Sequence, residues 1–115
     1  MGIWGDGIFE NDAASAAKAI FEVALADGAS VVQATKQVLD ELKAMAEDEG
    51  VLSVIVLALA ALQSESNQLQ PEIKAQALDI ISTGKGLKYW EELGEVNLQQ
   101  RKSTLEKFKE KLQNA

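Results

Sequence analysis

The sequence predicts an all-α fold, a single small bundle of five or six helices around a buried central helix at residues 51–62. Eleven of these twelve residues are apolar, and no charged residue occurs between Glu49 and Glu65. A helix without a polar stripe is buried on all sides. The β-branched residues of its first half also suit an inner strand. The run at 57–62, LALAAL, favours a helix, however, and no partner strand is evident elsewhere.

Two amphipathic helices are expected before the central one. Asn11 or Asp12 caps the first, which extends to about Ala26, and Ser30 caps the second. The inward stripe of the second helix follows spacings of three and four residues and consists of Val31, Thr35, Val38, Leu42 and Met45. The acidic run at 47–49 then precedes the central helix, where negative charge is favourable for the helix dipole.

Three helices are expected after the central one. Pro71 at a first helical position predicts a helix to about residue 82, and a short helix follows at 87–93. The last helix is expected from Asn97 to about Gln113, with an inner stripe of Leu98, Leu105, Phe108 and Leu112. The basic residues of this helix are interpreted as an ordinary solvent-exposed face: Arg101, Lys102, Lys107, Lys109 and Lys111. The whole chain, 1–115, is expected to form a single helical domain.

The first eleven residues, MGIWGDGIFEN, form a glycine-rich segment without helical periodicity. Trp4 and Phe9 are too apolar for a free tail, so we expect them to pin the segment onto the helices. Four polar residues are candidates for lining a pocket or binding a metal ion through oxygen, namely Asp6, Glu10, Asn11 and Asp12. The favoured alternative for these four is structural, in turn formation and helix capping.

Trp4 and Trp90 are the only tryptophans, and each suits one of two roles. Tryptophan is frequent at binding hot spots, and the charged neighbours of Trp90 resemble the polar rim of such a site. The alternative, favoured for both residues, is a position in the core or beneath a covering segment.

Composition excludes several classes of enzyme. The chain has no histidine and no cysteine, so it contains no Ser-His-Asp triad, no HExxH zinc site and no thiol nucleophile. Its net charge is −7, and residues 1–84 carry 13 acids against 4 bases. Such an acidic body disfavours nucleic-acid binding and suits a basic protein partner. The order of charged and apolar residues predicts neither a secretion signal nor a membrane span, so a cytoplasmic location is expected.

The opening residues carry a specific pattern, with Met1, Gly2, Trp4, Gly5, Gly7, Phe9, Asn11 and Asp12 at fixed spacing and alanine at 13 and 14. This pattern resembles an uncharacterised bacterial family, a domain of unknown function whose members begin M-G-x-W-G-x-G-x-F-x-N-D-x-A. The family's alanine-rich middle helix is similar to residues 51–62, its Leu-x-x-Trp segment to residues 87–90, and its closing helix to residues 98–112. Relatives often carry Ser-Glu-Leu before the second tryptophan, where this chain has Lys85-Gly86-Leu87. The resemblance implies a shared fold and no particular activity, substrate or cofactor.

These observations predict a non-enzymatic protein-binding module, of the immunity or antitoxin type, with a basic protein partner. The alternatives are a small-molecule or metal-binding protein that uses carboxylates of the N-terminal segment, and a homo-oligomer held by the last helix. The predicted binding residues are Trp4, Asp6, Glu10, Asn11, Asp12 and Trp90. No cofactor and no resident metal are expected.

Overall fold

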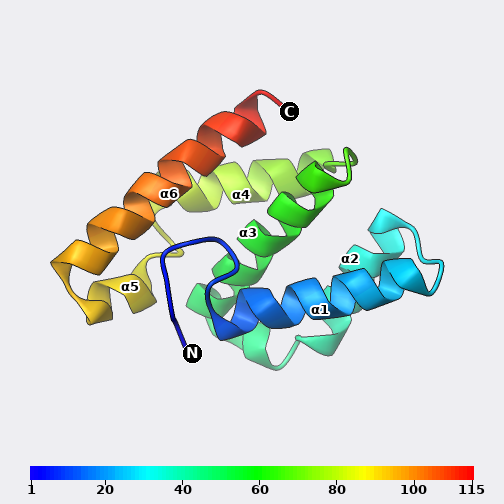
Figure 1. Ribbon diagram of the computed structural model, residues 1–115, viewed down its shortest axis with the longest axis horizontal. Helices are drawn as coiled ribbons and strands as arrows, with labels where there is room; N and C mark the ends of the chain where they lie inside the picture. The colour runs from blue at the N-terminus through cyan, green and yellow to red at the C-terminus, as the bar shows by residue number, and fades with distance from the viewer.

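The computed structural model describes residues 1–115 and contains six α-helices and no β-strand (Figure 1). The helices are α1 (Asp12–Ala26), α2 (Val31–Glu41), α3 (Glu49–Glu65), α4 (Pro71–Thr83), α5 (Lys88–Leu93) and α6 (Glu95–Gln113), and the 3₁₀ turn η1 (Met45–Glu47) precedes α3. The predicted all-α bundle is confirmed. None of the helices combines the length and the apolar character needed to cross a membrane.

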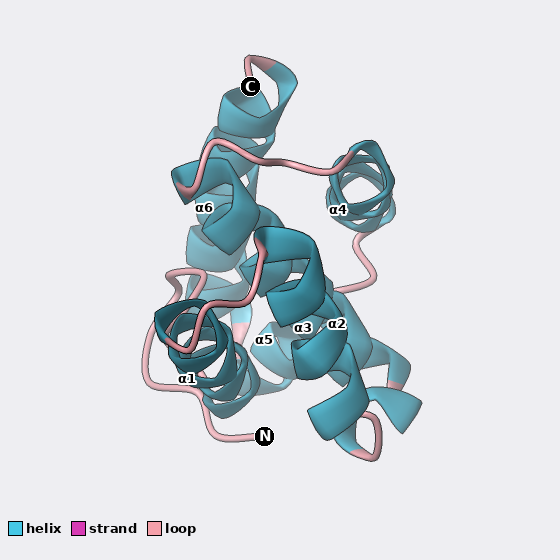
Figure 2. Cartoon of the chain, turned by 90° about the vertical axis from the view of Figure 1, so that its right-hand side faces the viewer, coloured by secondary structure: helices cyan, strands magenta, loops and turns pink.

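Helix α3 lies in the middle of the molecule, as its apolar composition predicts. Helices α1 and α4 pack against α3, while α2 packs on α1 and α6 on α4, an arrangement that Figures 1 and 2 show from two directions. Every residue from 53 to 63 is buried. The helix starts before residue 51 because the Asp48 carboxylate caps it, accepting hydrogen bonds from the amides of Gly50 (2.8 Å) and Val51 (3.3 Å).

Local signals set the start of three other helices where the sequence predicts them. Asn11 caps α1, and Ser30 and Gln33 form a capping box at the start of α2. Pro71 occupies the beginning of α4, and Gly84 ends that helix in the left-handed conformation with φ of 76°. These ends are fixed by residues within a few positions of each helix terminus, which is why the pattern alone locates them.

Two predicted boundaries are wrong. Helix α2 ends at Glu41, so Met45 falls in η1 and is 40% exposed instead of completing the inward stripe. The last helix begins at Glu95 instead of Asn97. The reason is that Gly94 adopts a positive φ of 111°, which glycine allows, and so turns the chain directly from α5 into α6.

One buried polar residue of α3 joins three parts of the fold. The amide nitrogen of Gln63 donates to Thr35 Oγ1 of α2 and to the Gln70 side chain, at 2.8 Å each. The side-chain oxygen of Gln63, Oε1, accepts a hydrogen bond from the Gln70 backbone amide at 2.9 Å. Because all of these bonds are made, the polar group is tolerated among apolar side chains and fixes the loop between α3 and α4.

Candidate functional site

The N-terminal segment, residues 1–11, closes on itself before α1 begins. Ile3 and Asn11 form an isolated antiparallel bridge, and the Trp4 amide donates to the Glu10 carbonyl oxygen at 3.0 Å. The Asp12 amide donates to the Gly2 carbonyl oxygen at 2.9 Å, and the Gly2 amide donates to Asp12 Oδ2 at 2.9 Å. The segment is therefore a hydrogen-bonded loop and not a loose tail.

The glycines of this loop leave room for its carboxylates. A Cβ atom at Gly2 would lie 2.5 Å from Asp12 Oδ2, and one at Gly5 or Gly7 would lie 2.5 Å from the Glu10 carboxylate. Glu10 Oε1 uses that space to accept a hydrogen bond from the Gly7 amide at 2.8 Å. The pairing of small residues with acids thus serves the closure of the loop.

Asn11 is fully buried and acts within the fold. Its Oδ1 accepts from the Ala14 amide at 2.8 Å, and its Nδ2 donates to the Ile8 carbonyl oxygen at 3.3 Å. The side chain therefore caps α1 and holds the loop to the helix start, which is the structural role predicted for it.

Helices α5 and α6 hold the outer turn of the loop through two fully buried side chains. Trp90 Nε1 donates to the Gly5 carbonyl oxygen at 3.4 Å. Arg101 Nη1 donates to the carbonyl oxygens of Asp6 and Gly7 at 3.2 and 3.1 Å. The guanidinium also stacks on the Trp90 ring, with 3.9 Å between Cζ and the ring centroid. In Figure 1 the loop lies between α5 and the start of α1.

Burial lowers the pKa of Arg101 to about 10, and the charge of Asp6 opposes that shift. The guanidinium therefore stays charged at neutral pH although the residue is 0% exposed. Two of its nitrogens, Nε and Nη2, are buried without a hydrogen-bond partner.

The assignment of Arg101 to the exposed basic face of the last helix is wrong. Position 101 completes the inward stripe at 98, 105, 108 and 112, with spacings of three and four residues. That spacing is the signal that sequence reasoning could have used, since a residue on the stripe faces the core whatever its charge.

Trp4 does not pin the segment, contrary to expectation. Its side chain is 59% exposed, whereas Ile3, Ile8 and Phe9 are half-buried against the core. Side chains alternate along extended backbone, so the inward position of Ile3 sends Trp4 outward. Phe9 contributes to the anchoring as predicted, and Trp90 is 0% exposed and presents no surface to a partner.

The predicted carboxylates do not form a cluster. Asp6 contributes its backbone oxygen to Arg101, and the carboxylates of Glu10 and Asp12 accept bonds from backbone amides of the loop. No group of three or more histidine, cysteine, aspartate or glutamate side chains lies together in a way that could hold a metal ion. The carboxylate chemistry of the segment is thus directed at its own backbone.

A separate polar contact joins α5 to the start of α3. The Tyr89 hydroxyl donates to Asp48 Oδ2, and Lys88 Nζ lies 3.9 Å from the same oxygen. The hydrogen bond from Tyr89 is the main cause that lowers the pKa of Asp48, and the same bond raises the pKa of Tyr89. This contact supports the position of α5 beneath the loop.

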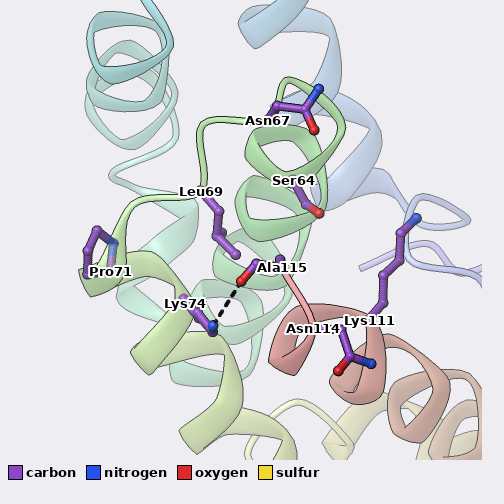
Figure 3. A pocket seen from close by; sticks show the side chains of 8 residues that line it. All are labelled: Ser64, Asn67, Leu69, Pro71, Lys74, Lys111, Asn114 and Ala115. Atoms are coloured by element: carbon purple, nitrogen blue, oxygen red, sulfur yellow. Dashed lines mark hydrogen bonds between the residues drawn. The ribbon is translucent and has the colours of Figure 1, made fainter.

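The largest surface cavity lies elsewhere, between the α3–α4 loop and the end of α6, with a volume of about 850 Å³. It is lined by Ser64, Asn67, Leu69, Pro71, Lys74, Lys111, Asn114 and Ala115. Figure 3 shows that Lys74 reaches the Ala115 carbonyl oxygen, at 3.4 Å, while Lys111 extends away from that pair. The polar groups therefore do not converge on one point, as they do in a specific ligand site.

No protein-family model, curated protein or solved structure matches this chain. The resemblance of its opening residues to an uncharacterised family stays a hypothesis. Function is inferred below from the geometry of the chain itself.

Proposed function

We propose that this protein is a non-enzymatic protein-binding module that recognises a basic partner through a surface centred on Trp4, in the manner of immunity and antitoxin proteins. The observation that carries the proposal is the 59% exposure of Trp4 on a loop whose backbone is held by α5 and α6. A loop whose backbone is already held loses less conformational entropy when it binds, and an exposed tryptophan supplies a large apolar contact area.

The surroundings of Trp4 suit a basic partner. Residues 1–18 contain three acids, Asp6, Glu10 and Asp12, against one base, Lys18, whose Nζ lies over the Phe9 ring. An apolar centre with an acidic rim is complementary to a partner with the opposite charge.

The alternative function, a small-molecule or metal-binding protein that uses the carboxylates of the segment, has less support. Glu10 and Asp12 already accept hydrogen bonds from the backbone of the loop. A ligand would have to replace those bonds before it gained any of its own.

The test is a pull-down from lysate of the source organism with three immobilised proteins, the wild type, Trp4→Ala and Val23→Ala. Val23 is the matched control because it is also 59% exposed but lies on α1. We expect one basic protein to be retained by the wild type and by Val23→Ala. Truncation of a hot-spot residue costs at least about 2 kcal/mol, so Trp4→Ala should weaken that interaction by about 30-fold.

Retention by all three proteins, or by none, contradicts the proposal. With the partner purified, the association rate should fall as salt is added, because opposite charges steer the encounter. Trp90→Ala is unsuitable for this experiment, since Trp90 is buried and its removal tests folding and not binding.

A further inference from the structure

Arg101 is the only arginine of the chain, and it is also the only one of the eleven basic residues that is buried. All ten lysines keep some contact with solvent. A guanidinium differs from an ammonium group because its five N–H donors form a rigid planar fork. The use of arginine at this one position indicates that the site depends on the fork and not on positive charge alone.

The hydrogen bonds of Arg101 leave one edge of the fork without a partner. Nη1 is occupied by the carbonyl oxygens of Asp6 and Gly7, whereas Nε and Nη2 have no partner. Nε and Nη2 share an edge of the guanidinium, and their N–H bonds point in nearly the same direction. Two such donors match the two oxygens of a carboxylate.

The carboxylates of the chain leave this edge unpaired. The two ion pairs of the structure, Lys85–Asp79 and Lys88–Asp48, do not involve Arg101. Asp6 makes its hydrogen bond with Arg101 through the backbone oxygen and not through its side chain. A buried charged donor without an acceptor is costly, and an oxyanion that bonds both donors of this edge would remove that cost.

We infer that the buried Nε–Nη2 edge of Arg101 is a binding site for one carboxylate group. The carboxylate comes either from a small free anion of the formate or acetate class or from the Asp6 side chain turned inward. Trp90 covers a face of the guanidinium, so the carboxylate approaches in the plane of the fork. This inference does not rest on the function proposed for the Trp4 surface, although Asp6 lies next to both.

The size of the ligand follows from the cover above the site. None of the four surface cavities is lined by Arg101. Because Nε and Nη2 are buried, a free anion enters only when the groups that cover them move, and it must be small enough for those groups to close again. Formate, the smallest carboxylate, is the appropriate probe.

The experiment is an NMR titration of the wild type and of Asp6→Asn with sodium formate, at ionic strength held constant with sodium chloride. Because the chain has one arginine, its Nε–H resonance is assigned without ambiguity. A saturable downfield shift in the wild type identifies a free anion as the occupant. If formate does not move the resonance in the wild type, the result in Asp6→Asn identifies the occupant. The Asp6 carboxylate is the occupant when the resonance is displaced in Asp6→Asn and then responds to formate.

An Nε–H resonance that neither formate nor the Asp6→Asn substitution changes overturns the inference. Arg101→Lys provides the second test, because it retains a positive charge and removes the fork. Where the wild type responds to formate, a folded Arg101→Lys protein, followed through the indole N–H of Trp90, should lose that response, and a response equal to that of the wild type overturns the inference. If Arg101→Lys does not fold, the first two proteins decide the outcome alone.

Discussion

Helix α3 and the N-terminal loop are both held firmly in this molecule, but by different forces. Residues 54–62 of α3 are all buried within the apolar core. The loop buries much less surface and relies on individual hydrogen bonds, among them those from Trp90 and Arg101 to its carbonyl oxygens. Apolar burial is nondirectional and depends on the volume filled, whereas the loop depends on particular atoms at particular positions.

This difference indicates which substitutions will lower the stability of each region. In α3 the loss of a large buried side chain leaves a cavity and lowers stability, while the substitution of a polar residue at either end of the helix has a smaller effect on stability. In the loop the reverse holds, because individual hydrogen-bonding groups, such as the Trp90 indole and the Arg101 guanidinium, connect it to the helices. The predictions below test this contrast, from the largest expected effect to the smallest.

Leu59→Ala should produce the largest effect, a decrease of about 2–5 kcal/mol in the free energy of unfolding. Leu59 is 0% exposed, so its truncation leaves a cavity inside the core. Urea denaturation measures the change. Leu52→Ala on the same helix is the matched control and should cost clearly less, because Leu52 is 37% exposed. Equal losses for the two variants would contradict the central position of α3.

Asn11→Ala should lower the free energy of unfolding by about 0.5–2 kcal/mol. The substitution removes the cap of α1 and the bond to the Ile8 carbonyl oxygen. Hydrogen exchange should also accelerate at the amides of the loop, with little change in α3. Asn114→Ala, at an exposed position after α6, is the control and should leave both measurements unchanged. A stable loop in Asn11→Ala would mean that the anchoring to α5 and α6 is sufficient.

Tyr89→Phe tests the contact between α5 and α3 through its pH dependence. The folded pKa of Asp48 lies below its usual value of 3.8, so this carboxylate stabilises the fold above that value and the contribution is lost as pH falls through the lowered pKa. The pKa of Tyr89 is raised above 10.0, so its contribution is present below 10.0 and is lost as pH rises through the raised pKa.

The difference in stability between the wild type and Tyr89→Phe should therefore be greatest between these two limits and decline on either side. Urea denaturation at a series of pH values measures it. A difference that stays constant from acid to alkaline pH would show that the bond between Tyr89 and Asp48 contributes nothing.

Trp4→Ala should have the smallest effect on folding, less than about 0.5 kcal/mol, because the side chain is mostly in solvent. Thermal denaturation checks this directly. A large loss of stability would mean that Trp4 anchors the loop, and it would remove the main support for a binding surface at this residue.

The sequence by itself determined the helices and the position of the central one. Apolar residues at 51–62, the caps Asn11 and Ser30, and Pro71 are all local signals, because each acts through its own helix or through composition. The same local character explains why the structural role of Asn11 was predictable.

Only the tertiary structure decided the roles of the two tryptophans and of Arg101. Trp4 and Trp90 are alike as residues, yet one is 59% exposed and the other 0% exposed. The contacts that separate them join positions about ninety apart in the chain, Gly5 with Trp90 and Asp6 with Arg101. Such contacts arise from how α5 and α6 pack beside the loop. The stripe of α6 indicates that position 101 faces inward, but it does not indicate which atoms Arg101 meets there.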